Sequence, residues 1–148
     1  MPLLPHKAVL AVAAVIDVAT QEQGKPISAK TLAERHSLPP RHLEPVLQAL
    51  VRCGILKGIR GPRGGYELAR DRRRVTVNDI LQAAGTVEES DEPQSDSELV
   101  KKVVLPAVAA AEREFGVALS RINVEDLARD AQALREQQLE PRTAEARR

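Results

Sequence analysis

Arginine and glycine are concentrated in one short stretch near the middle of the chain. The sequence IRGPRGGYELAR, residues 59–70, contains three arginines, three glycines and one proline. The glycines allow the positive φ angles of a narrow turn, and Pro62 stiffens it. The guanidinium groups of Arg60 and Arg63 would lie at the tip, where they can bind phosphate oxygens or enter a groove of negative potential. The stretch therefore has the chemistry to contact a nucleic acid.

The residues around these arginines predict a β-hairpin rather than a nucleotide-binding loop. ILKGI before the turn and YELA after it alternate apolar and polar residues, as two antiparallel strands do. Neither G-x-G-x-x-G nor G-x-x-x-x-G-K-S/T is present, and no helix is expected to begin at the turn. We therefore expect a hairpin with a basic tip.

Two short helices are expected directly before the hairpin. Ser28 can cap the first, AKTLAERH, and the turn SLPP leads to the second, RHLEPVLQALVRC, whose first turn tolerates Pro40. Apolar residues recur at three- and four-residue spacing from Leu43 to Leu50, which predicts one buried face, and Gly54 ends the helix. Two such helices followed by a hairpin are the pattern of a winged helix-turn-helix.

An apolar run, residues 8–16, predicts the first helix of the chain. The run is too short to span a bilayer, Asp17 interrupts it and a single Lys precedes it, so we expect neither an export signal nor a membrane segment. We expect the buried face of this helix to consist of Val9, Val12, Ala13 and Ile16.

Charge is distributed unevenly along the 148 residues, whose formal net charge is only +1. Residues 25–74 contain twelve Lys or Arg and four Asp or Glu, a net charge of +8, whereas residues 86–148 contain nine basic and fourteen acidic residues, a net charge of −5. The basic block is consistent with either a solvated face or a nucleic-acid-binding face. An enzyme is not expected, because no nucleophile, base and orienting group occur with a suitable spacing.

A long helix is expected after the acidic loop, beginning at a capping box of Ser95 and Glu98. Pro106 is expected to kink it and Gly116 to weaken it. Its apolar stripe is longer than one small domain can easily cover, so we expect it to pack against a second copy, against the first helix, or both. In a dimer the two recognition helices would lie about one DNA turn, ~34 Å, apart. The stripe comprises Val100, Val104, Val108, Ala111, Phe115, Leu119 and Ile122.

The sequence from ISAKTLAERH through VTVNDILQAAG resembles the DNA-binding domain of the Rrf-two family, the IscR/NsrR/CymR-type bacterial transcription regulators. The shared features are LA at 32–33, LE at 43–44, GIL at 54–56, the RGPRGGYELAR hairpin and VTVNDIL after it. The likeness extends over roughly residues 5–132.

The resemblance implies a homodimer that binds double-stranded DNA at a partly palindromic operator and controls transcription, with repression as the expected direction. The single cysteine is consistent with a reducing, cytoplasmic setting. Arg41 would contact guanine or a phosphate, and Glu44 would accept from a cytosine amino group or simply balance Arg41. Pro45 departs from the family pattern and leaves the docking angle open. A winged-helix module for a protein or RNA partner is the alternative. The expected DNA-binding set is Ser28, Pro40, Arg41, His42, Glu44, Lys57, Arg60, Arg63, Gly64 and Gly65.

Many family members hold an iron–sulfur cluster with three cysteines in the loop before the long helix. Here that loop, GTVEESDEPQSDSE, contains no cysteine, so we expect no cofactor, and its carboxylates predict a mobile acidic loop rather than a metal site. Cys53, the single cysteine, is expected to act as a small apolar residue or as a redox-active thiol. The three histidines lack metal-ligand spacing: His6, His36 and His42.

These patterns predict a mainly α fold with a small β-hairpin wing, namely a winged helix-turn-helix with a long C-terminal dimerisation helix. We expect the DNA-binding domain at residues 1–85, the acidic loop at 86–97, dimerisation helices at 98–138 and a disordered tail at 139–148. Asn123 and Asp126 are expected to cap the final helix, which would end near Gln138. No small-molecule effector is identified by a residue pattern.

Overall fold

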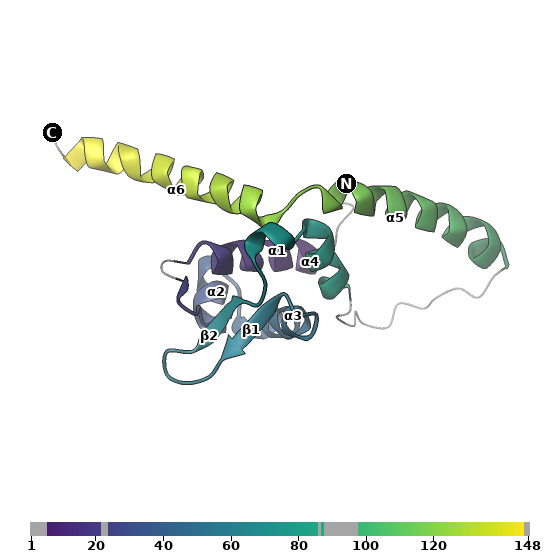
Figure 1. Cartoon of the computed structure of the whole chain (residues 1–148), viewed down its shortest axis with the longest axis horizontal. Helices are drawn as coiled ribbons and strands as arrows, with labels where there is room; N and C mark the ends of the chain where they lie inside the picture. Colours follow the sequence, from purple (N-terminus) through teal and green to yellow (C-terminus); the bar gives the residue numbers. More distant parts are fainter. Residues whose placement is uncertain (1–5, 22–23, 86, 88–97, 147–148) are drawn as a thin grey trace.

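A computed structural model of the chain describes residues 6–21, 24–85, 87 and 98–146. The bulk of the fold is helical, and two long helices extend away from it in different directions (Figure 1). The elements are α1 (His6–Ala19), α2 (Ala29–Arg35), α3 (Pro40–Arg52), β1 (Leu56–Ile59), β2 (Gly65–Leu68), the 3-10 turn η2 (Arg72–Arg74), α4 (Val77–Ala84), the π-helical turn η3 (Val100–Val104), α5 (Leu105–Ser120) and α6 (Val124–Ala146).

The predicted helix-turn-helix is formed by α2 and α3. The Ser28 hydroxyl accepts a hydrogen bond from the Thr31 backbone N–H at 3.1 Å, which caps α2. Leu43 and Leu47 of α3 have no exposed surface, as their spacing predicts. Gly54 follows α3 with φ +75°, the left-handed conformation that commonly ends a helix.

The predicted wing is an antiparallel hairpin in which β1 and β2 pair from Leu56 with Leu68 to Ile59 with Gly65. A backbone bridge joins it to the start of α2. Ile27 N–H donates to the Tyr66 carbonyl at 3.1 Å, and Tyr66 N–H donates to the Ile27 carbonyl at 2.8 Å. The wing is thereby held in a fixed position relative to the helix-turn-helix.

The buried face of α1 differs from the predicted one. Val9 is 49% exposed, and Val12, Ala13 and Ile16 are only half-buried, so the prediction for this face was wrong. Because α1 is apolar on nearly every side, periodicity alone does not select the buried face. Its alanines let neighbouring helices approach closely, and the buried residues are Ala8, Ala11, Ala14, Val15, Asp17 and Val18.

The start of α6 belongs to the core of the winged domain. Val124 and Ala128 have no exposed surface, and Val124 N–H donates to the Val75 carbonyl at 2.9 Å. Asn123 caps α6, as predicted, by accepting from the Asp126 backbone N–H at 2.9 Å. The start of α6 is thus joined to residues 1–85, and a strand-like bridge of Thr76 with Asn123 adds a further link.

Helix α6 continues to Ala146 rather than ending near Gln138. Pro141 does not end the helix, because a proline removes only one helical hydrogen bond and the alanines and glutamates around it favour helix. The predicted tail at residues 139–148 is thus helical as far as Ala146.

The apolar helix after the acidic loop contains a π-helical turn, η3, which ends two residues before Pro106. Proline cannot donate the N–H that a regular α-helix needs, and π turns commonly occur at such interruptions. Ser95 and most of the predicted acidic loop lie outside the described residues.

The mainly helical architecture with a two-stranded wing confirms the predicted fold class. Among the described residues, no helix is both long and apolar enough to cross a bilayer.

Candidate nucleic-acid interface

The N-terminal turn of α3 presents polar side chains to solvent. Arg41, His42 and Glu44 are exposed, while Leu43 between them is completely buried. Pro39 precedes the helix in an extended conformation and accepts a backbone hydrogen bond from His42 at 3.1 Å. The buried leucine fixes the rotation of the helix, so the three polar residues project away from the core.

Two prolines shape this helix. Pro40 occupies its first position, where the missing N–H has no helical partner to lose. Pro45 lies inside the helix and is exposed, so its ring does not disturb the core. Because Pro45 has no N–H to donate to the Arg41 carbonyl, the first turn of the helix is held less tightly than the rest.

The tip of the wing is exposed and basic. Gly61 has φ +113°, and the Gly64 N–H donates to the Gly61 carbonyl at 2.9 Å, closing the turn. Arg60 and Arg63 are exposed at this turn and have no ion-pair partner within the described part of the chain. Their guanidinium groups are therefore available to bind a ligand.

The two predicted wing glycines, Gly64 and Gly65, lie where the neighbouring backbone leaves no room for a side chain. A Cβ at Gly64 would lie only 2.9 Å from the Gly61 carbonyl oxygen. Gly65 has φ +153°, and a Cβ there would overlap the backbone of Ile27 and approach the Ser28 nitrogen to 2.8 Å. Only glycine lets the wing close its turn and approach the start of α2 this tightly.

Two residues of the predicted DNA-binding set already have partners within the chain. The Ser28 hydroxyl caps α2 and lies 2.9 Å from the Thr31 hydroxyl. Lys57 on β1 faces Glu67 across the hairpin, with Nζ 3.6 Å from a carboxylate oxygen. Ser28 therefore caps a helix and Lys57 pairs across the hairpin, and the predicted DNA contact of each stays a prediction.

Sequence reasoning missed two arginines that position the interface. The Arg70 Nε donates to the Gly54 carbonyl at 3.1 Å, which ties the end of the wing to the end of α3. Arg72 forms an ion pair with Glu125 of α6 and donates to the Ala19 carbonyl of α1 at 3.4 Å. These arginines counted toward the basic block, and only tertiary contacts distinguish them from Arg60 and Arg63.

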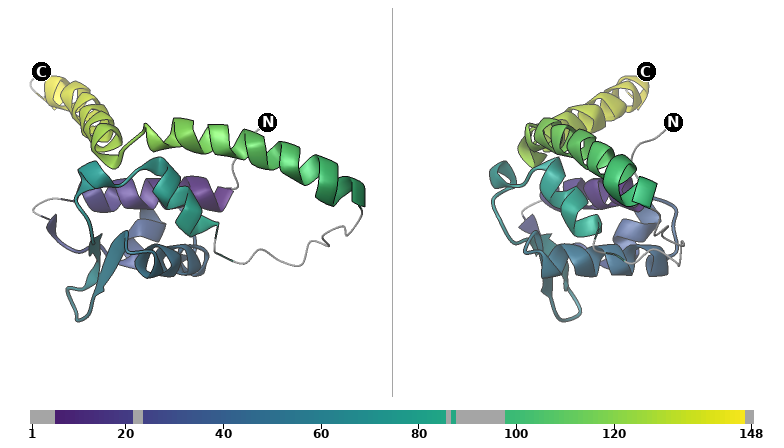
Figure 2. Two further views of the ribbon diagram at one scale, coloured as in Figure 1. Left: turned by 45° about the vertical axis from the view of Figure 1, so that its right-hand side comes forward. Right: turned by 90° about the vertical axis from the view of Figure 1, so that its right-hand side faces the viewer.

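The wing and α3 lie on one side of the molecule, and α5 and α6 lie on the opposite side, in each of three views (Figures 1 and 2). The exposed start of α3 and the basic tip of the wing can therefore contact one surface together. A helix in one groove of a duplex with a hairpin beside it would need both elements on one side in this way.

The predicted redox residue Cys53 lies at the C-cap of α3, and its backbone N–H donates to the Ala49 carbonyl at 3.0 Å. The residue is exposed rather than packed as a small apolar residue. Oxidation of its thiol stays a prediction.

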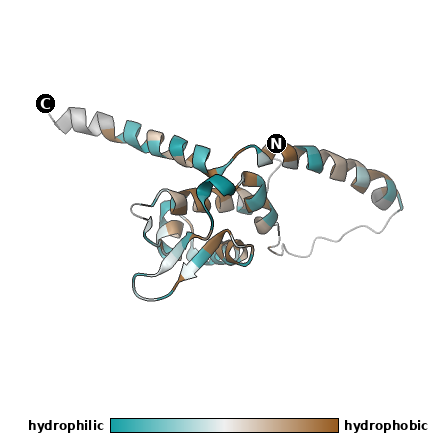
Figure 3. Cartoon of the chain, viewed as in Figure 1, coloured by the Kyte–Doolittle hydropathy of each residue, from teal (hydrophilic) through white to brown (hydrophobic). Residues whose placement is uncertain are grey.

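The predicted dimerisation stripe lies partly against the winged domain. Phe115 and Leu119 are half-buried on the side of α5 near α4, where Gly116 approaches the Asn78 side chain. By contrast, Val104 and Val108 are 43% and 45% exposed, and Ala111 and Ile122 are also exposed. The side chain of Val100 lies outside the described part. Figure 3 shows apolar residues along α5, and α5 has no buried residue.

The chain is similar to known transcription regulators over most of its length. The family model described as "Rrf2: Iron-dependent Transcriptional regulator" matches residues 4–130. A Synechocystis sp. protein described as an HTH-type transcriptional regulator, slr0846, is 36% identical over 135 residues, which are 88% of this chain and 90% of that protein. The IscR of Xenorhabdus nematophila is 36% identical over 80 residues, about half of each chain.

The chain also resembles solved structures of transcription regulators. The chain superposes on T. potens IscR with a TM-score of 0.66 and 31% identity, covering 88% of both chains. It superposes on CymR, described as the global cysteine regulator of B. subtilis, with a TM-score of 0.63 and 27% identity, covering 86% of this chain and 97% of CymR. With the exposed recognition helix and basic wing, these likenesses show that the chain is a DNA-binding transcription regulator and belongs to the Rrf2 family.

Proposed function

We propose that this regulator acts as a homodimer that occupies a partly palindromic operator and represses transcription. The observation that carries the proposal is the division of the molecule into two faces. The wing, whose exposed tip carries Arg60 and Arg63, lies on the same side as α3, and α5, which has exposed apolar residues, lies on the opposite side (Figure 2). A repressor needs only to occupy its site, which this interface can do without further contacts.

Each copy would read DNA with α3 and fix its position with the wing. Arg41 can donate two hydrogen bonds to a guanine edge in the major groove, and Glu44 can accept from a cytosine amino group. Arg60 and Arg63 would enter the narrow minor groove or bind the adjoining phosphates. The α3 contacts would supply base specificity, and the wing contacts most of the salt-dependent affinity.

The dimer would form through α5. Leu99, Val103 and Leu105 are 66%, 59% and 52% exposed, beside the stripe residues Val104 and Val108. Apolar residues this exposed, over several turns of one helix, are typical of a protein interface. A two-fold axis at α5 would place both recognition helices on the same side of the dimer.

We also propose that operator binding needs no iron–sulfur cluster. The family description names iron, but the chain has one cysteine, and Cys53 lies at the end of α3. A cluster held by three thiolates does not fit this donor set. Within the described residues, no group of three His, Cys, Asp or Glu side chains could hold a metal ion.

A catalytic role forms no part of the proposal, since the family consists of regulators and the exposed polar residues at α3 and the wing suit DNA contact. The place of action would be the cytoplasm, where the chromosome lies.

Selection of bound genomic fragments by the purified, metal-free protein at moderate salt, read by sequencing, tests the proposal. The expected result is an enriched palindrome whose half-sites lie about one DNA turn apart. Arg60→Ala or Arg63→Ala should lower the recovery of these fragments, while the matched control Arg129→Ala, on α6 and paired with Asp126, should not. Retention without any sequence preference would contradict the proposal.

A further inference from the structure

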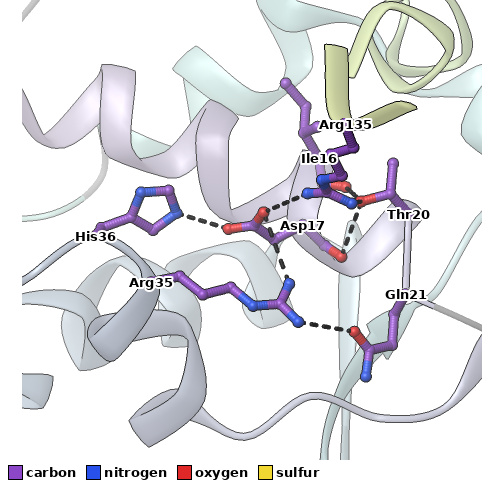
Figure 4. A network of polar contacts seen from close by, with 7 residues as sticks. All are labelled: Ile16, Asp17, Thr20, Gln21, Arg35, His36 and Arg135. Carbon is purple, nitrogen blue, oxygen red and sulfur yellow. Dashed lines mark hydrogen bonds and ion pairs between the residues drawn. The ribbon is translucent and has the colours of Figure 1, made fainter. Parts of the chain in front are cut away.

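A polar cavity of about 430 Å³ lies where α1, α2 and α6 meet, away from the proposed DNA interface. Its described lining consists of Thr20 and Gln21 just after α1, Arg35 at the end of α2 and Arg135 of α6. Figure 4 shows these four side chains converging on one region from three elements. Two of the four carry a positive charge.

The wall of the cavity is organised around one buried carboxylate. Asp17 of α1 is only 7% exposed and is the only buried polar or charged residue among those that the structure describes. Its Oδ1 accepts from Arg135 Nη2 at 3.2 Å and lies 3.8 Å from Arg35 Nη1. Its Oδ2 lies 2.6 Å from His36 Nε2. Asp17 thus holds both arginines at the edge of the cavity.

Neighbouring polar groups fix the two guanidinium groups further. Arg135 Nη1 donates to the Thr20 hydroxyl at 2.8 Å, and Arg35 Nη2 donates to the Gln21 side-chain oxygen at 3.3 Å. The side chains of Arg35 and Arg135 are 38% and 44% exposed, so a ligand in the cavity can reach them. Each guanidinium has five N–H donors, and several in each remain for a ligand.

Positive charge exceeds negative charge among the Arg and Asp side chains that the structure describes in this cluster. Arg35 and Arg135 supply two positive charges and Asp17 supplies one negative charge. An anionic ligand would therefore be attracted to the two guanidinium groups. Planar carboxylates match the fork of a guanidinium group and bind it with two parallel hydrogen bonds.

We propose that this cavity is a binding site for a small organic monocarboxylate, held between Arg35 and Arg135. The volume falls within the range of about 300–1,000 Å³ that is common for small-molecule sites, and the polar lining suits an acid rather than an apolar ligand. The Gln21 side-chain amide can donate a further hydrogen bond to the ligand, and the Thr20 hydroxyl, which donates to the Ile16 carbonyl at 2.9 Å, holds Arg135 in place.

The position of the site suggests what binding does. Arg135 belongs to α6, which begins beside the proposed dimer helix, and Arg35 is the last residue of α2, the first helix of the helix-turn-helix. A carboxylate that bridges these arginines changes the link between the two regions. Occupancy is therefore expected to change operator affinity, a consequence that rests on the proposed function, whereas the binding itself does not.

The test is an NMR titration of the isotope-labelled full chain with propionate at constant ionic strength, without DNA. Saturable shifts should cluster at Thr20, Gln21 and the two arginines, with a Kd on the order of millimolar for so small a probe. Propionamide, which has the same shape without the charge, should give no such shifts. Absence of saturation at about 20 mM propionate, or tighter binding of inorganic phosphate, would overturn the proposal.

Variants separate the site from general charge effects. Arg135→Gln and Arg35→Gln should each raise the Kd about tenfold, and Thr20→Val, which keeps both arginines, should raise it about threefold. Arg129→Gln on the same helix should leave it unchanged, because Arg129 pairs with Glu125 and Asp126 instead. An equal increase of the propionate Kd in Arg129→Gln and Arg135→Gln would contradict the proposed site.

A second measurement addresses regulation alone. Propionate at a saturating concentration should change operator affinity at least about threefold in the parent protein and not in Arg135→Gln. If propionate binds and affinity stays the same, the regulatory role is wrong while the site stands. If no operator binding is seen at all, the proposed function fails and the titration result is unaffected.

Discussion

The winged domain and helix α5 bury their apolar side chains to opposite extents. Leu43, Leu47 and Leu50 of α3 have no exposed surface, whereas Leu105 and Val117 of α5 are 52% and 51% exposed. The winged domain thus contains its own hydrophobic core. Helix α5 contacts that domain only along one side, and its exposed apolar side chains are where the second copy of the proposed dimer would pack.

In the proposed dimer, the residues that stabilise the fold therefore differ from the residues that hold the two copies together. A change in the core should lower the free energy of unfolding of each copy, and a change on α5 should affect association and leave folding intact. Changes at the wing should affect neither, and lower DNA affinity only.

The largest effect is expected from Leu47→Ala. It removes a completely buried side chain from the centre of the core and should lower the free energy of unfolding by about 2–5 kcal/mol. Urea denaturation followed by circular dichroism measures it. Val103→Ala, at an exposed position, is the control and should change stability by less than about 0.5 kcal/mol at low protein concentration. An equal loss of unfolding free energy in the two variants would contradict the distinction between the buried core and the exposed apolar residues.

The double variant Val104→Glu with Val108→Glu should produce a folded monomer. Two carboxylates on the exposed stripe would have to be desolvated in the interface, so dimer dissociation should be favoured by roughly 100-fold or more. Sedimentation equilibrium gives the association state, and thermal unfolding checks the fold. A variant that stays dimeric would place the interface elsewhere.

Arg60→Ala should weaken operator binding by about 1–3 kcal/mol, a factor of roughly 5 to 150. The residue is exposed at the wing tip, so the unfolding free energy should stay the same. Fluorescence anisotropy at several salt concentrations measures both affinity and its salt dependence, which should become shallower. An unchanged salt dependence would show that Arg60 does not contact phosphate.

The smallest effect is expected from Lys57→Ala. Its ion pair with Glu67 is largely solvent-exposed, so stability should change by less than about 1 kcal/mol. Thermal unfolding at low and high salt measures it. A larger loss would mean that the hairpin depends on this pair for its register.

Sequence patterns predicted the elements that have one apolar side. Leu43 to Leu50 of α3 recur on a helical face beside polar residues, and the structure buries that face. Helix α1 is apolar nearly all round, so its buried face depends on which neighbours pack on it, and the prediction selected Val9 wrongly. The basic wing was predictable because its glycines and Pro62 specify the turn locally.

Features that depend on distant contacts could not be predicted. Arg135 meets Asp17 across 118 positions in the chain, and neither residue stands out from its neighbours in sequence. The same holds for Arg70 and Arg72, which look like part of the basic block yet tie the wing and α6 to the core. Sequence patterns identify the basic block that is proposed to meet DNA, and only the fold shows which of its arginines already have partners within the chain.

The most direct test of the central claim is the stoichiometry of the metal-free protein on its selected palindrome, measured by sedimentation velocity. The proposed function predicts that two chains bind one duplex as a unit without added iron, and that the double α5 variant binds weakly as single chains. Binding of one wild-type chain per duplex, or binding that appears only after iron and sulfide are supplied, would contradict it.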